Sequence, residues 1–341
     1  MAKYGKYFIM AVIGVFVVLT AAQALRAETI ELKMAHFMSP MHIQHQQSFV
    51  PFTKEVEKLT GGRVKIRIFP GGALGGAPEL ADSVKTGIAD IAFIVPSYTT
   101  GRFPRTSVFD LPFIFDNAIQ AAEVLYAVYD KYLAEDFKDY KVLWLYSCDT
   151  GQLHSVGKQI RVLADLQGMK MRAPSSYMSE ALKLLGSNPV SMPLSELSMA
   201  LDKHVIDGML SPSSSLKDFK LTETIKNTTQ IDFYISPMAV IMNKEKYNSL
   251  PDYARKAIDQ ASGKKRGLLA AKIYDDYAKT SLKYLSDTGK IKVYRLAPDE
   301  KKKFIEKLKK MEVEWVAKNA IKGIPARELM DRIHELAAKT K

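Results

Sequence analysis

Short apolar segments alternate with amphipathic segments along much of the chain, and this alternation constrains the fold more than any other feature. Residues 64–68 alternate apolar and charged side chains, as in a half-buried strand. Residues 43–59 instead place apolar side chains at helical spacing, and residues 88–95 form a nearly continuous apolar run that is typical of a strand buried on both faces. Strands that alternate with helices predict an α/β protein with mostly parallel sheets.

The same patterns predict the other elements of this region. Strands are expected at residues 31–36, 64–68, 88–95, 142–146, 169–172, 189–192 and 205–208. Helices are expected at residues 43–59, 78–86, 118–132, 177–185 and 195–202. Ligands of such folds gather beyond the carboxyl ends of strands, so polar residues that directly follow a strand are the first candidates for a site.

A long helix is expected after the alternating region. Pro251 stands at a helix start, and apolar residues keep a helical rhythm from Ala254 to Leu285, with Gly263 and Gly267 inside the run and Gly289 at its end. About 35 residues at 1.5 Å each span roughly 50 Å, which is longer than one small domain. The helix is therefore expected to cross two domains, and 341 residues at about 150 per domain also predict two.

The N-terminus has the pattern of an export signal. Lys3 and Lys6 precede an apolar run at residues 8–19, and Ala22-Gln23-Ala24 supplies small residues for cleavage, with Ala27 as a second candidate. The alternative is a membrane anchor, but the run is shorter than the ~20 residues that span a bilayer. We therefore predict a signal peptide at residues 1–27 and a periplasmic protein.

The net charge of +12 raises nucleic acid or a membrane surface as partners. Removing residues 1–27 takes away three basic residues and lowers the charge to +9, and the remaining basic residues are scattered among acidic ones. Export and the scattered positions of the basic residues argue against a nucleic-acid partner. A basic surface would instead attract small anions.

The single cysteine, Cys148, excludes a disulfide framework and a cysteine-built zinc site. It is either a small buried residue or a free thiol with a redox role.

Motifs of common catalytic chemistry are absent from the sequence. It contains no nucleotide-binding glycine motif, no Gly-x-Ser-x-Gly and no His-Glu-x-x-His. The glycine-rich residues 71–76 suit a turn better than a phosphate site, and His42 and His45 are only a weak metal signal. The residues indicate no metal and no cofactor, and nothing in them positively indicates a nucleophile–base pair of an enzyme.

One short segment points to a ligand. Arg172 ends a predicted buried strand and Pro174 stops it, so the guanidinium is expected beyond the edge of a sheet. Arginine is the residue for bidentate carboxylate recognition, although a salt bridge between domains would use the same position.

With this segment, the sequence resembles the solute-binding proteins of tripartite ATP-independent periplasmic (TRAP) transporters, the DctP family. The resemblance runs from about residue 30 to the C-terminus, through LKMAHFMSPMHIQHQ, VKIRIFPGGALGGAPELADSVKTGIADIAF, FDLPFIF, LADLQGMKMRAP, PLSELSMALDKHVIDG and MNKEKYNSLPD. It implies two α/β lobes joined by crossing strands and a long helix. One lobe would comprise residues 28–148 and 236–272, the other residues 149–235 and 273–341.

The resemblance also implies a ligand site between the lobes. Arg172 would pair with the ligand carboxylate. The other residues would lie at the edge of the cleft: Ser211, His36, Ser97, Tyr98, Gln152, His154 and Tyr234. Ser211 occupies a position that is Asn in many members of the family. Gln152 and His154 lie near the sequence position where many members have a second Arg. A one-headed acid is therefore easier to accommodate than a compact dianion.

Several of these residues have alternative roles. His36 could bond to the backbone at the strand end, Tyr98 and Tyr234 could be core residues, and Ser211 could cap a helix that Pro212 starts. The resemblance predicts a monomeric periplasmic receptor for a small organic acid that serves a TRAP permease. The alternatives are an organosulfonate ligand, an exported α/β enzyme with Arg172 as substrate clamp and His36 or His154 as base, and a sensor subunit.

Overall fold

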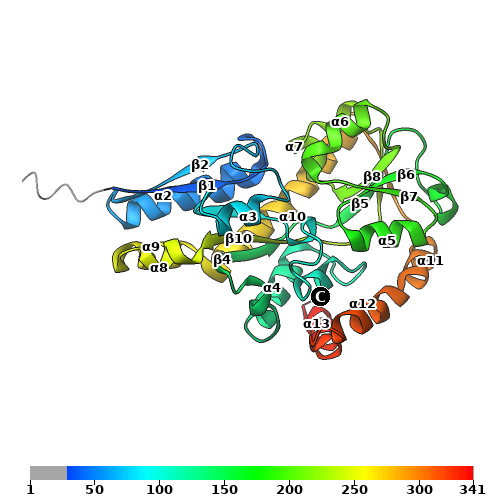
Figure 1. Cartoon of the computed structure of the whole chain (residues 1–341). Helices are drawn as coiled ribbons and strands as arrows, with labels where there is room; N and C mark the ends of the chain where they lie inside the picture. Colours follow the sequence, from blue (N-terminus) through cyan, green and yellow to red (C-terminus); the bar gives the residue numbers. More distant parts are fainter. Residues whose placement is uncertain (1–28, 341) are drawn as a thin grey trace, which may run out of the picture.

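Two β-sheets, one in each of two lobes, organise the computed structural model, which describes residues 29–340 (Figure 1). The predicted signal peptide lies outside these residues. Within them, no helix combines the length and the apolar composition needed to cross a membrane. The expected two-lobed α/β architecture is confirmed, whereas the predicted lobe boundaries stay a prediction.

Five strands form the first sheet. Their order is β2 (Val64–Phe69), β1 (Ile30–Ala35), β3 (Ile91–Ile94), β10 (Pro237–Asn243) and β4 (Tyr140–Ser147). β1 pairs in parallel with β2 and β3, and β10 pairs antiparallel with β3 and β4.

Six strands form the second sheet. Their order is β11 (Lys292–Arg295), β9 (Asn227–Gln230), β5 (Gly151–Ser155), β8 (Gly208–Pro212), β6 (Lys170–Ala173) and β7 (Asn188–Ser191). β6 is parallel to β7 and β8, and β11 to β9, but β5 is antiparallel to β8 and β9. Both sheets are therefore mixed, because strands that cross between the lobes enter each sheet against its main direction.

Helices cover both sheets. They are α2 (Val50–Leu59), α3 (Leu80–Lys85), α4 (Ala118–Val128), α5 (Ser176–Leu184), α6 (Leu197–Asp202), α7 (Ser215–Asp218), α8 (Lys244–Ser249), α9 (Asp252–Ala261), α10 (Gly263–Asp287), α11 (Pro298–Leu308), α12 (Lys310–Ala320) and α13 (Ala326–Lys339). A wider π-helical turn at His45–Phe49 leads into α2, and another at Tyr129–Leu133 follows α4. Both lie inside helices that the sequence predicts as single elements.

The expected long helix is present with one interruption, between α9 and α10. Ser262 has an extended backbone and Gly263 has a φ of 82°, so the helical hydrogen bonds break at this point. α10 then continues from the first lobe to the second (Figure 1). Ala270 and Tyr274 belong to the core of the first sheet, whereas Leu285 packs in a core beside the second sheet.

Two chain segments cross between the sheets side by side. The link from β4 to β5 pairs with the link from β9 to β10: the Gly151 N–H donates to Tyr234 O at 2.7 Å, and the Phe233 N–H donates to Gly151 O at 2.8 Å. Cys148 lies in the first of these links, is 1% exposed, and accepts a hydrogen bond from the Ser236 N–H at 3.2 Å. Burial raises the pKa of its thiol far above the usual range, which favours the structural role over a redox role.

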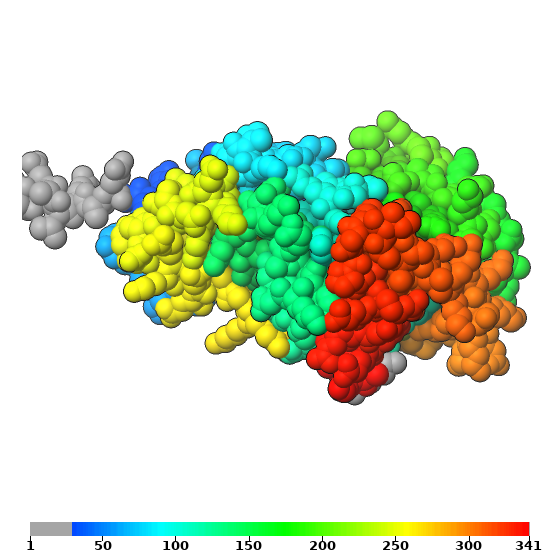
Figure 2. Space-filling view, turned by 60° about the horizontal axis from the view of Figure 1, so that its bottom comes forward, coloured from blue at the N-terminus to red at the C-terminus, as the bar shows by residue number. Residues whose placement is uncertain are grey.

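The C-terminal helices return to the first half of the chain. Figure 2 shows the C-terminal segment lying against the segment that contains α4. The Gln120 side chain donates to Ala337 O at 2.8 Å, and the Tyr132 hydroxyl donates to the Glu328 carboxylate at 2.7 Å. α4 therefore packs in one core cluster with α12 and α13.

One predicted strand was wrong in position. The sequence predicts residues 205–208, but β8 begins at Gly208. His204 has a φ of 53° and forms a left-handed turn that delays the strand.

Candidate functional site

Arg172 is fixed inside the molecule by backbone carbonyls. β6 ends at Ala173, and the Arg172 side chain is fully buried. Its Nε donates to Met192 O and its Nη1 donates to Leu210 O, both at 2.9 Å. These two bonds hold the guanidinium in one orientation near the end of β6.

The Arg172 charge has no carboxylate partner among residues 29–340. A third bond, from Nη2 to the Tyr98 hydroxyl, is long at 3.4 Å. Because a guanidinium has five N–H donors, two of them have no acceptor in the described chain. A buried charge is costly unless it is paired, so this position favours an anion as an additional partner. The alternative role of Arg172, a salt bridge between domains, is not formed among residues 29–340.

Tyr98 connects the two lobes at this point. It ends a short 3₁₀ helix (Pro96–Tyr98) that follows β3 of the first sheet. Its hydroxyl accepts a hydrogen bond from the Leu194 N–H at 3.3 Å, and Leu194 follows β7 of the second sheet. Burial raises the pKa of Tyr98, and the nearby Arg172 charge offsets only part of this rise, so the side chain remains a neutral phenol.

Aromatic rings extend from Tyr98 along the edge of the first sheet. Phe37 lies 6.0 Å from Tyr98 and 5.5 Å from Phe93, measured between ring centroids. Phe93 lies 6.0 Å from Tyr146, which stacks on Tyr274 at 6.2 Å. These rings form an apolar wall near the buried cation. Of these five aromatic residues, only Tyr98 was predicted from the sequence as a site residue.

His36 follows β1 and is held by a second histidine. Its Nε2 lies 2.8 Å from Nδ1 of His45. Burial, and next to it the charge of His45, lower the pKa of His36 to about 3, so the ring is neutral at pH 7. His42 does not join a metal site but contacts Asp218 of α7 at 3.3 Å, and no metal-binding group of three His, Cys, Asp or Glu residues occurs at positions 29–340.

Ser211, Gln152 and His154 are engaged within the second lobe. The Ser211 hydroxyl lies 2.5 Å from that of Ser215, and one ring nitrogen of His154 bonds to Ser211 O at 3.0 Å. The Gln152 amide donates to the Thr150 side chain at 2.9 Å and accepts from the Ile231 N–H at 2.7 Å. Ser211 lies in β8 and caps no helix. A ligand contact by any of the three would require an exchange of these bonds.

Tyr234 packs in the crossing segment. It is 2% exposed, and its ring lies so close to Gly151 that a Cβ there would come within 1.9 Å of the ring. Burial raises the pKa of Tyr234 well above its usual range, and the nearby Arg172 charge partly opposes the rise. Tyr234 thus combines a core position with proximity to Arg172.

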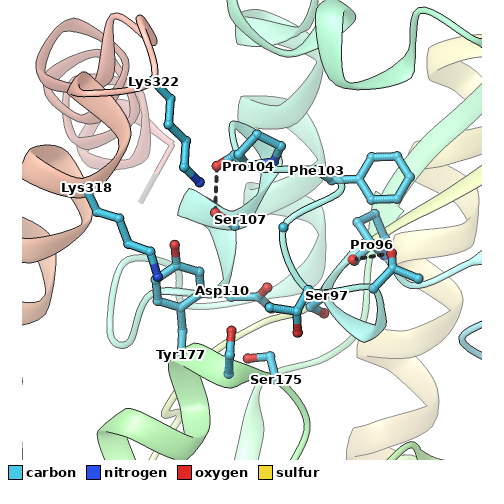
Figure 3. A pocket seen from close by; sticks show the side chains of 14 residues that line it. Pro96, Ser97, Phe103, Pro104, Ser107, Asp110, Ser175, Tyr177, Lys318 and Lys322 are labelled. Atoms are coloured by element: carbon cyan, nitrogen blue, oxygen red, sulfur yellow. Dashed lines mark hydrogen bonds between the residues drawn. The ribbon is translucent and has the colours of Figure 1, made fainter.

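A pocket opens between the lobes next to these residues, and we call it the mouth pocket (Figure 3). Residues 96–110 line one side, and the opposite side is lined by Ser175, Ser176, Tyr177, Lys318 and Lys322. Only Ser97 of this set was predicted. Asp110 had a sequence signal, because it interrupts the apolar run at residues 108–115, but the two lysines had none.

A second pocket adjoins the mouth pocket, and we call it the inner groove. Both share Ser97, Thr100, Ser175 and Ser176 in their walls. The inner groove is also lined by Tyr98 and Met192, which are two of the three residues that bond to the Arg172 guanidinium. The inner groove therefore reaches residues that hold Arg172, while Arg172 itself lines neither pocket.

Asp110 is a buried carboxyl in the wall of the mouth pocket. It is 1% exposed, and neither carboxyl oxygen has a partner with hydrogen-bond geometry in the described chain. Burial raises its pKa to about 8, although the nearby Ser97 and Ser236 hydroxyls oppose the rise. At pH 7 the group is therefore mostly protonated.

Replacing Asp110 by asparagine is expected to remove a pH-dependent loss of stability. Because the folded pKa lies above that of the unfolded chain, the wild type loses stability as the pH rises from about 4 to about 8. Urea unfolding should show Asp110→Asn gaining about 2 kcal/mol relative to the wild type between pH 5 and pH 7. The exposed control Asp299→Asn should show no such gain, and a pH-independent difference for Asp110→Asn would contradict the assignment.

A family profile matches most of the chain. Residues 34–319 match the profile described as bacterial extracellular solute-binding protein, family 7.

Two curated relatives are similar over 65% and 83% of their own length. A Haemophilus influenzae protein without an assigned function is 33% identical over 62% of this chain and 65% of its own. The C4-dicarboxylate-binding periplasmic protein DctP of Rhodobacter capsulatus is 26% identical over 81% of this chain and 83% of its own.

Solved structures are similar over nearly the whole described chain. A TRAP solute-binding protein from Rhodoferax ferrireducens with copurified benzoate has a TM-score of 0.87 and 32% identity, covering 91% of this chain and 98% of its own. A marine metagenome TRAP protein specific for aromatic acids, with 3-hydroxybenzoate, has the same TM-score and identity at 92% and 99% coverage. A Bordetella bronchiseptica protein with bound mandelate has a TM-score of 0.84 and 26% identity, at 92% and 100% coverage.

Proposed function

The chain belongs to family 7 of the bacterial extracellular solute-binding proteins, and from this premise we propose that it is a periplasmic receptor for an aromatic monocarboxylate. The ligand carboxylate pairs with Arg172 between the two lobes. The receptor then delivers the acid to a TRAP permease for uptake driven by an ion gradient. It acts as a monomer and binds no nucleic acid.

The buried, unpaired charge of Arg172 is the single observation that supports this proposal most. Its guanidinium is oriented by two carbonyls and has N–H groups left for another acceptor. A planar carboxylate fits such a fork with two hydrogen bonds, and burial strengthens the ion pair. A sulfonate offers the same charge with a tetrahedral head, so organosulfonates are the second ligand class to test.

The aromatic wall supports an aromatic body of the ligand. The Tyr98 ring lies at the Arg172 guanidinium, and Phe37 and Phe93 continue the ring contacts from Tyr98 into the core. Rings pair favourably with other rings at such distances. Three similar structures hold benzoate, 3-hydroxybenzoate or mandelate. One buried cation, without a second one nearby in the described chain, suits one carboxylate better than two.

Closure of the lobes would couple binding to delivery. Arg172 is fully buried, so an acid reaches it only when the lobes separate. Contacts such as Tyr98 to Leu194 and His42 to Asp218 form again when they close. A ligand that favours the closed form shifts the population toward it, and the permease would distinguish the closed form from the open one.

The enzyme alternative has little support from the two candidate bases. The pKa of His154 is lowered to about 4 by burial, and both of its ring nitrogens are bonded within the protein. His36 is likewise held by His45. A general base needs reach to its substrate, and these bonds restrict both rings.

A thermal-shift screen tests the proposed function. We expect benzoate and its hydroxylated relatives to raise Tm by several degrees, because a ligand at 100 times its Kd adds about 2.7 kcal/mol to the folded state. Aliphatic dicarboxylates and neutral sugars should give no shift. A preference for dicarboxylates would refute the aromatic assignment, and a response to no acid at all would refute the receptor function.

A further inference from the structure

The mouth pocket has the composition of an anion site, separate from Arg172. Lys318 lies in the C-terminal part of α12 and Lys322 just beyond its end, and both face the pocket (Figure 3). Neither ammonium has a carboxylate within 4 Å in the described chain. Their positive charge therefore remains available to a ligand.

The start of helix α5, on the same side of the pocket as the two lysines, adds hydrogen-bond donors and more positive potential. Ser175 is the N-cap of the nine-residue helix α5, and the N-terminus of a helix carries a partial positive charge. The Ser176 and Tyr177 side chains line the same wall. This helix end alone would not define a site.

A buried, unsatisfied polar group in the facing wall, which residues 96–110 form, points independently to a ligand. Asp110 is almost wholly buried, yet its carboxyl oxygens have no partner with hydrogen-bond geometry among residues 29–340. The neighbouring Ser97 hydroxyl is unpartnered in the same way. Because Asp110 is mostly protonated at pH 7, it does not repel an anion and can donate a hydrogen bond to one.

We propose that the mouth pocket is a second anion subsite, which holds the carboxylate of an incoming organic acid before it reaches Arg172. The inner groove adjoins both positions, because it shares Ser97 and Ser175 with the mouth pocket and is also lined by Tyr98 and Met192, which bond to Arg172. Only the transfer from one position to the other rests on the proposed function. The anion subsite itself rests on Lys318, Lys322, Asp110 and Ser97.

Association kinetics test the subsite in solution with benzoate as the probe. At low ionic strength we expect Lys318→Gln/Lys322→Gln to lower the association rate constant at least fivefold and to change the dissociation rate constant less than twofold. The matched control Lys309→Gln/Lys310→Gln removes the same charge at the other end of α12 and should leave both constants within twofold. The difference in association rate constant between the two variants should shrink in 0.5 M salt, because salt screens the attraction between the lysines and the acid. Equal association rates for the two variants would overturn the proposal.

Anomalous diffraction from crystals soaked in 4-bromobenzoate separates this proposal from the proposed function. Bromine beside Lys318 and Lys322 supports the subsite, and bromine near Arg172 supports the receptor function. Crystals of Lys318→Gln/Lys322→Gln should lose the first signal and keep the second. If the wild type shows no bromine in the mouth pocket, the subsite is refuted whatever occurs at Arg172. If the variant keeps that signal, the lysines do not form the site.

Discussion

Replacing Arg172 by alanine is expected to lower the affinity for benzoate at least 100-fold while the protein still folds. The variant loses a charge-assisted, bidentate contact in a buried site, and breaking a buried ion pair typically costs about 3–5 kcal/mol. A loss of about 3 kcal/mol corresponds to more than a 100-fold change in Kd. Calorimetric titration measures it directly.

Two further variants separate charge from shape at this position. Arg172→Lys keeps the charge but loses the planar fork, and it should recover only a small part of the affinity. Arg332→Ala, which replaces a half-buried arginine on α13, should bind like the wild type. Far-ultraviolet circular dichroism should show that all three variants are folded. If folded Arg172→Ala bound benzoate with unchanged affinity, Arg172 would not be the ligand contact.

Replacing Gly267 by alanine is expected to cause the largest loss of stability. Gly267 lies in α10 where the helix touches β4, and a Cβ there would lie 2.1 Å from Leu145 O and 2.4 Å from the Tyr126 hydroxyl. The Leu145 N–H already donates to that hydroxyl at 2.9 Å, so neither neighbour moves easily. Overpacking of this kind costs about 3 kcal/mol, although alanine in a helix would otherwise gain about 1 kcal/mol over glycine.

Urea denaturation measures the loss of stability of Gly267→Ala, and Gly157→Ala is the matched control. Gly157 has no heavy atom within 4 Å of its virtual Cβ, and it lies in a loop of the second lobe. Gly157→Ala should therefore change the free energy of unfolding by less than about 0.5 kcal/mol, as is usual for surface substitutions. Equal stability of Gly267→Ala and the wild type would mean that α10 does not pack so closely on β4.

The sequence was sufficient for the α/β class and for elements with strong periodicity. The predicted strand at residues 64–68 matches β2 within one residue, and the predicted helix at residues 177–185 matches α5 equally well. Four strands were missed: β5, β9, β10 and β11. β5 and β9 are rich in polar side chains that bond to one another across the sheet, so they lack the apolar alternation on which the prediction depends.

The candidate site could be predicted only where one segment carries the signal. Arg172 was identified because strand, arginine and proline are adjacent in sequence, and its burial agrees with that reading. Lys318 and Lys322 come from a helix far along the chain, and only the fold brings them opposite Ser97 and Asp110. The same holds for the contact of His42 with Asp218, which links the two lobes. Periodicity cannot report such long-range contacts.

A calorimetric titration of the protein with benzoate, followed by recovery of the acid, tests whether the protein is a receptor for an aromatic acid. We expect saturable binding with one acid per chain, and we expect the acid to be recovered chemically unchanged. Heat from one-to-one binding that disappears in Arg172→Gln would place the acid at the buried cation. A titration without saturable heat for benzoate or any other organic acid, or recovery of a converted product, would contradict the account.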